Sequence, residues 1–209
     1  MILEWSLILS VTLVSVTMLM IIGAFFAILP QAQEYYSQNR TMVLLLSNSF
    51  NIFYIIISPF IFNLLNKHYV KGVLISAVAT GAAAIGRYLA AEDYQLCLLM
   101  TVIVAIAHIP IITAPYGLLK LFPDWQKSYA ASIPLFLPVL GINFCILYGM
   151  AFITSDNNAG ITTAQVHAEI SKLNGIIASV GLVSTISTVI LMLALKDKIE
   201  DKGDSSDNK

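Results

Sequence analysis

Six long runs of apolar residues, separated by short polar segments, make up most of this chain. Each run reaches the roughly 20 residues that a helix needs to cross about 30 Å of hydrocarbon. None carries a polar stripe long enough to give a helix a water-facing side. Because helices satisfy their backbone groups internally in lipid, the pattern predicts an all-α, polytopic membrane protein. The six expected spans are Leu7–Leu29, Met42–Leu65, Val70–Ala91, Leu96–Leu119, Ala130–Ile153 and Leu173–Leu195.

Two hydrophilic stretches stand outside this pattern. Residues 1–195 are expected to form one six-helix transmembrane domain, and residues 196–209 a charged, flexible C-terminal tail. The tail alternates Lys with Asp and Glu, a composition that cannot build a hydrophobic core. Between the fifth and sixth spans, Thr154–Lys172 is expected to be a polar extramembrane loop with a short amphipathic helix through Thr162–Ile170.

Composition supports lipid as the solvent and narrows the functional classes. Hydrophobic residues make up 58% of the 209 residues and charged residues 11%, against roughly 25% charged residues in a globular domain. A net charge of -1 argues against nucleic-acid binding, which needs a basic surface. The sequence has no plausible catalytic Ser/His/Asp set, metal-ligand spacing or phosphate-binding glycine loop. We therefore expect no enzyme activity, no cofactor and no metal.

The distribution of basic residues predicts the orientation of the helices. Eight Lys residues follow the second, fourth and sixth spans, whereas Arg40, Arg87 and Lys172 lie on the opposite side. The positive-inside rule then places both termini in the cytoplasm or its topological equivalent. The sequence leaves open whether the membrane is the plasma membrane or that of an organelle, including the mitochondrial inner membrane.

Small residues repeat along one face of three of the spans. Gly141, Cys145 and Gly149 are four residues apart in the fifth span, as are Gly181 and Thr185 in the sixth. The third span is rich in Ala and Gly throughout. Small side chains let helix backbones approach closely in a membrane, so these stripes predict helix-packing faces.

From the third span onward, several short motifs resemble a known family. They are Ile109-Pro110, Ala114-Pro115, Leu121-Phe122-Pro123, Gln126-Lys127, Tyr129-Ala130-Ala131-Ser132 and Leu140-Gly141-Ile142-Asn143. Together they resemble the N-terminal half of a major facilitator superfamily transporter. The likeness is greatest to the feline leukaemia virus subgroup C receptor-related group, which handles haem, choline and ethanolamine. The resemblance implies a six-helix half of a major facilitator fold and a small organic solute.

The segment between the second and third spans departs from the superfamily pattern. There the family has a gating loop that combines an acidic residue, basic residues and a glycine. Lys67 and Lys71 fit the basic positions, but Asn66 stands in place of the acid and Tyr69 in place of the glycine. Because an amide cannot make the charge-assisted bond of a carboxylate, we expect the latch to be weakened or lost.

Polar and aromatic residues within or near the spans are the candidates for substrate binding. An amide or imidazole buried without a partner costs roughly 1–3 kcal/mol, so these groups should face protein or a wet cavity. They would either line a substrate cavity or make interhelical contacts, which average about 0.6 kcal/mol each. Aromatic rings would hold a choline-like amine by cation–π attraction. The candidates are Asn48, Asn51, His108 and Asn143, with Asn143 the strongest, and the aromatic residues Tyr116, Tyr148 and Trp125.

Two functions follow from these features. The first is one half of a carrier for a small organic solute, such as a choline- or ethanolamine-like amine. Its partner would be a second six-helix half, either a second copy or a separate chain. Because no acidic residue falls inside an expected span, movement would be facilitative or driven by the membrane potential. The alternative is a transport-incompetent structural subunit of a larger membrane complex.

Overall fold

A computed structural model describes residues 1–153 and 162–204, and all the regular secondary structure of the described part is helical. Six of its helices are long and apolar enough to cross a membrane. This confirms the all-α fold and the prediction of six helices long and apolar enough to span a membrane. The long helices are α1 (Ile2–Gly23), α3 (Arg40–Lys67), α4 (Tyr69–Ala90), α5 (Tyr94–Leu118), α6 (Asp124–Tyr148) and α7 (Thr163–Ala194). The short elements are α2 (Leu29–Tyr35), the 3-10 turn η1 (Leu119–Leu121), the π-helical turn η2 (Gly149–Ile153) and α8 (Lys196–Asp204).

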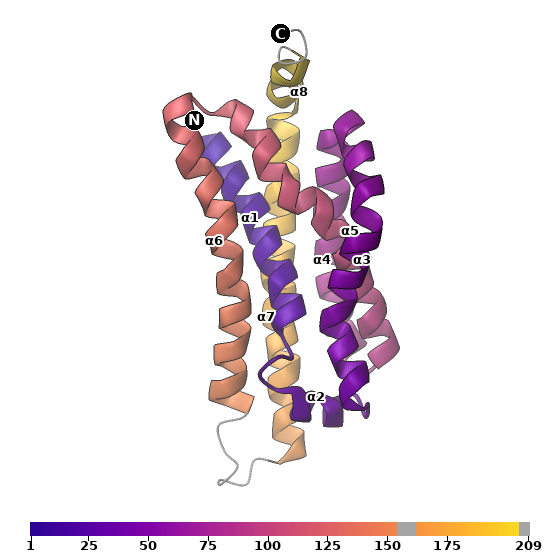
Figure 1. The fold of residues 1–209 in the computed structure, drawn as a ribbon. Coiled ribbons are helices and arrows are strands. Elements are labelled where there is room, and N and C mark those ends of the chain that lie inside the picture. The colour runs from indigo at the N-terminus through magenta and orange to yellow at the C-terminus, as the bar shows by residue number, and fades with distance from the viewer. Residues whose placement is uncertain (154–161, 205–209) are drawn as a thin grey trace.

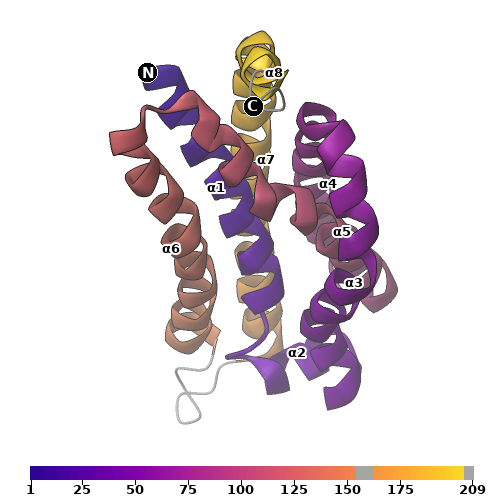
Figure 2. The same cartoon turned by 45° about the horizontal axis from the view of Figure 1, so that its top comes forward.

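The long helices form one bundle in which α6 and α3 lie at opposite edges (Figure 1). Helix α1 runs through the middle, α7 lies behind it, and α4 and α5 join α3 on the other side, as the turned view also shows (Figure 2). The N-terminus and α8 lie at one end of the bundle, here called the termini end. Helix α2 lies at the other end, here called the loop end.

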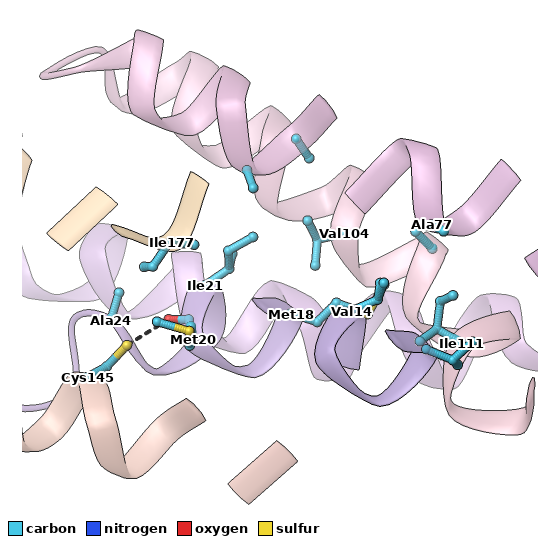
Figure 3. Close-up of a cluster of buried hydrophobic side chains, with 14 of the residues drawn as sticks. Val14, Met18, Met20, Ile21, Ala24, Ala77, Val104, Ile111, Cys145 and Ile177 are labelled. Carbon is cyan, nitrogen blue, oxygen red and sulfur yellow. Dashed lines mark hydrogen bonds between the residues drawn. The ribbon is translucent and has the colours of Figure 1, made fainter. Parts of the chain in front are cut away.

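Helix α1 is the centre of the packing. It is apolar on all sides, a property typical of helices that are buried on every face, and it contacts each of the other five long helices. Leu7, Val14 and Met18 have no exposed surface. Figure 3 shows Ile21 close to Val104 of α5 and Ile177 of α7, with the Cys145 thiol of α6 donating to the Met20 carbonyl oxygen at 3.4 Å.

The first helix differs in position from the expected span. It begins at Ile2 instead of Leu7 and ends at Gly23, where a turn leads into α2, which has Pro30 in its first turn. The expectation that no span holds an acidic residue is therefore wrong, because Glu4 lies in the first turn of α1. Glu4 is 4% exposed and pairs with Lys198 of α8. Its place near a helix N-terminus suits its negative charge.

The polar stretch before the sixth span also differs from its description as a loop. Residues 154–161 lie outside the described residues. From Thr163 the chain is helical, and Thr162 caps α7 in a reciprocal pair with Gln165. The amphipathic segment is therefore the start of α7, because the capping box begins the helix there and no proline follows.

The segment assigned to the tail begins as helix α8. Its Ile199 is 8% exposed, and α8 packs on η1, so the described part of this segment contacts the bundle. The Lys198–Glu4 pair joins it to α1. Residues 205–209 lie outside the described residues.

The small-residue stripes are packing faces, as predicted. A Cβ atom added to Gly141 would lie 2.7 Å from the backbone oxygen of Val16 in α1. One added to Gly81 would lie 2.5 Å from Oγ1 of Thr185, whose hydroxyl donates to the Ala77 carbonyl oxygen. The close helix pairs α1–α6 and α4–α7 therefore depend on these small residues.

Substitution of Gly141 tests the close approach of α1 and α6. Gly141→Ala should lower the free energy of unfolding by roughly 1–3 kcal/mol, because the methyl group meets backbone that cannot rotate away. Gly175→Ala is the matched control, since its added Cβ would lie 3.4 Å from the Tyr88 ring, an ordinary contact. Thermal unfolding in detergent micelles measures both. Equal midpoints for the two variants would contradict the proposed packing.

Candidate functional site

His108 is the one polar substrate-binding candidate that the fold encloses. It lies on α5 at 4% exposure, and its Nδ1 is 3.1 Å from the Met18 sulfur of α1. Two rings of α3 meet the imidazole edge to face, Phe50 at 4.7 Å and Tyr54 at 6.1 Å between ring centres. His108 therefore lies where α1, α3 and α5 meet, in an aromatic and thioether environment.

The three asparagine candidates are exposed. Asn48 and Asn51 lie on the outer face of α3, and Asn143 lies on α6. Asn143 follows Gly141 by two residues, about 200° around the helix, and Gly141 faces α1. Asn143 therefore points away from the bundle, and the fold does not bring it close to His108.

These exposed amides lie on α3 and α6, the two least buried of the long helices. In the most apolar window of α3 17% of residues are buried, and in that of α6 22%, compared with 72% in α1. None of the three amides has a hydrogen-bond partner among the described residues. Since an unpaired amide in hydrocarbon costs roughly 1–3 kcal/mol, these two helix faces are suited to contact with another polar protein surface.

The aromatic candidates lie at opposite ends of the bundle. Tyr116 (60% exposed) and Trp125 (71% exposed) are at the termini end. Tyr148 is at the loop end, where its hydroxyl donates to Glu169 at 2.8 Å. Roughly 35 Å of helix separates Trp125 from Tyr148. One copy of the chain therefore does not bring these three rings together.

The segment matching the gating loop connects α3 and α4 at the termini end. The side chains of Asn66 and Lys67 lie outside the described part of the structure. Lys71 is exposed in the first turn of α4. Tyr69 donates to the Ala114 carbonyl oxygen, and its ring lies against Gly117, which has no side chain to obstruct it. Tyr69 thus packs α4 onto the end of α5.

A buried arginine lies at the loop end, and the sequence alone did not indicate its role. Arg87 of α4 is 1% exposed, whereas the sequence indicated only that it lies near the end of the third span, on the side opposite the termini. Its Nη1 donates to the carbonyl oxygen of Ile21, and its guanidinium carbon lies 4.6 Å from the Phe25 ring centre. Ile21 is in the last turn of α1, where carbonyl groups lack intrahelical partners and cations are favoured. Arg87 therefore caps α1 from a neighbouring helix.

Aromatic residues extend this contact across the loop end. The Tyr36 ring lies 5.5 Å from that of Phe25 and 4.9 Å from that of Tyr35, both edge on. The Tyr35 ring lies 4.9 Å from that of His167 on α7. We call Phe25, Tyr35, Tyr36, Arg87 and His167 the Arg87 cluster. It joins α1, α2, α4 and α7.

Two further polar contacts hold this cluster to α5 and to the loop before α5. The Tyr36 hydroxyl is 3.2 Å from the Cys97 sulfur, and Nδ1 of His167 is 2.8 Å from a Glu92 carboxylate oxygen. Burial raises the pKa of the Tyr35 phenol to about 12 and raises that of Tyr36 well above its ordinary value. Both phenols therefore stay neutral at physiological pH. Tyr35 contacts His167, and Tyr36 contacts Phe25, the ring over which Arg87 lies.

No known family model matches the chain, and no curated protein matches it. Within residues 1–153 and 162–204, no group of His, Cys, Asp and Glu side chains is arranged to hold a metal ion. The fold therefore defines a class, an all-helical multi-pass membrane protein with six long apolar helices.

Labelling of Cys97 tests whether the Arg87 cluster closes the loop end. In a Cys145→Ala background, His167→Ala should raise the maleimide labelling rate of buried Cys97 about fivefold. The substitution removes a ring contact and a hydrogen bond to Glu92 that together contribute roughly 1 kcal/mol. Lys172→Ala is the control on the same helix, because Lys172 pairs with Glu169 outside the cluster. Unchanged labelling in the His167 variant would contradict this role.

Proposed function

We propose that this chain is one six-helix half of a major-facilitator-type carrier for a small organic solute, and that a second six-helix half covers α3 and α6. The observation that carries the proposal is the position of the intramembrane amides. Asn48, Asn51 and Asn143 all lie on the exposed faces of the two least buried long helices. A second half placed against these faces would supply the missing hydrogen-bond partners and enclose a polar cleft.

The packing of the helices supports this reading. Helix α1 packs on α6 and α7, as α5 packs on α3 and α4, and α4 packs on α7. The first three long helices can be matched with the last three, α1 with α5, α3 with α6 and α4 with α7. Under this exchange each of the packed helix pairs becomes another packed pair or itself. Inverted three-helix repeats of this kind are nested in each half of major facilitator transporters.

The amine specificity rests on the sequence resemblance and on aromatic side chains. Phe50 and Tyr54 of α3 are stacked with their ring centres 5.9 Å apart, beside His108. Such rings attract a quaternary ammonium by roughly 2 kcal/mol when the pair is desolvated. Choline-like and ethanolamine-like amines are therefore the first solutes to test.

The second half is proposed to be another copy of the chain in the same orientation, which fits the parallel relation of the two halves in such carriers. Figure 1 shows α3 and α6 at opposite edges of the bundle. A twofold axis along the membrane normal then brings α3 of one copy against α6 of its partner. This geometry gives a specific cross-linking pattern.

In a background without Cys97 and Cys145, the double variant Asn51→Cys, Asn143→Cys should form a cross-linked dimer with a short bis-maleimide. Each single variant should give much less dimer, because like helices do not meet across the axis. The control is the double variant Val78→Cys, Val183→Cys, whose positions on α4 and α7 are 51% and 62% exposed. Equal cross-linking of this control would contradict the assignment of the face. Cross-links from positions 51 and 143 to a different membrane protein would show that this protein, and not a second copy, is the other half.

Solute uptake tests the activity itself. Proteoliposomes containing the chain should take up choline or ethanolamine, and an inside-negative potential should increase uptake of the permanent cation choline. Asn143→Leu should reduce uptake at least about fivefold, since removing one partner of a buried polar contact costs roughly 1–3 kcal/mol. Val139→Leu, on the same helix and also exposed, should leave uptake unchanged. A correctly cross-linking dimer without amine uptake would instead favour the structural-subunit function.

A further inference from the structure

A groove opens on the side of the bundle between α3, α4 and α5, near the termini end. Its volume is about 470 Å³, within the range of ligand-binding cavities. Apolar side chains from all three helices form most of its wall, including Leu65 of α3, Ile75 and Ala79 of α4, and Ile103 and Ile106 of α5. His68 and Lys71 stand at one end.

The groove exists because α3 and α4 diverge. Helix α3 packs along α5 and makes few contacts with α4. Small residues on the facing helices, Ala79 on α4 and Ala107 on α5, leave the space unfilled. From Lys71 to Ala79 the groove follows about 12 Å of α4. Because Ile75 is 70% exposed, the groove opens sideways, toward the hydrocarbon that surrounds a membrane-spanning helix.

The polar end of the groove is suited to an anion. His68 is the N-cap of α4 and makes no side-chain capping bond, and no acidic residue lies in the first turn of α4. The unpaired backbone N–H groups of that turn and the helix dipole favour a negative charge. Lys71 adds an ammonium group, and neither His68 nor Lys71 has a side-chain partner among the described residues.

We propose that this groove binds an anionic phospholipid, with one acyl chain along Leu65, Ile75 and Ile106 and the phosphate at His68, Lys71 and the α4 N-terminus. Both parts of the ligand are needed to match the surface, since the wall is apolar and the cationic groups lie only at the level of the helix end. A zwitterionic lipid such as phosphatidylcholine presents the same phosphate beside its own quaternary ammonium, which weakens the net attraction to Lys71. The basic residues at the termini end place this groove on the predicted cytoplasmic side, where anionic lipids concentrate. The proposal does not depend on transport.

The test is competition for lipid retained by the purified full chain. The chain is exchanged into detergent with equal amounts of phosphatidylglycerol and phosphatidylcholine of identical acyl chains, and bound lipid is measured by native mass spectrometry. We expect phosphatidylglycerol to be retained in preference. Lys71→Ala should weaken its retention about fivefold, the effect of one basic residue near a membrane surface, and should weaken that of zwitterionic phosphatidylcholine less. Lys127→Ala is the matched control, a lysine at the same end that pairs with Asp124 of its own helix.

A second variant tests the apolar wall. Ala79→Leu narrows the groove and should reduce the retention of both lipids, and the elution volume on size exclusion reports whether it folds. If Ala79→Leu does not fold, Ile106→Ala at an exposed position serves instead and should weaken retention of both lipids. Equal retention of the two lipids, or no effect of Lys71→Ala, overturns the proposal. Displacement of the lipid by glycerol phosphate or inorganic phosphate at equal concentration also overturns it, because the acyl chain would then contribute nothing.

Discussion

The burial of α1 on all sides is the constraint on which the bundle depends. Each of the other long helices contacts α1, and helices α3 and α6 occupy opposite edges because α1 and its neighbours fill the space between them. In a membrane, the hydrophobic effect favours helix–helix contacts little over helix–lipid contacts, because both are apolar. Close packing therefore has to hold the helices together. Gly141 and Cys145 let α6 approach the backbone of α1.

Polar contacts stabilise the two ends of α1, where apolar packing ends. At the termini end, Glu4 pairs with Lys198 and so joins the first helix to α8. At the loop end, Arg87 binds the Ile21 carbonyl group and lies against Phe25. Between these ends the polar groups near α1 include hydroxyls that bond to their own helix, such as that of Thr12 to Ile8, and the His108 imidazole beside Met18. These two charged contacts thus fix the orientation of α1 at its ends.

The sequence predicted the features that depend on local pattern. Six apolar runs gave six helices, and the small-residue stripes gave the α1–α6 and α4–α7 contacts. Contacts between distant residues could not be predicted this way. The burial of Glu4 and Arg87 could not be predicted, because hydropathy cannot show that Lys198 and Ile21 contact them in space. For the same reason, nothing in the sequence indicated that His108 is enclosed while Asn143 is exposed.

The contact between α1 and α7 has a consequence for the order in which the protein can assemble. Thr17 lies against Gly181, which is synthesised roughly 160 residues later. At about 5–20 residues per second, the ribosome needs about 8 to 30 s to make that intervening chain. During this interval the side of α1 that contacts α7 has no partner from its own chain. Helices α4 and α5, which are adjacent in sequence, can already pack on each other. The core is therefore completed only when α7 enters the bilayer. Until then, the side of α1 that will contact α7 remains uncovered by the chain.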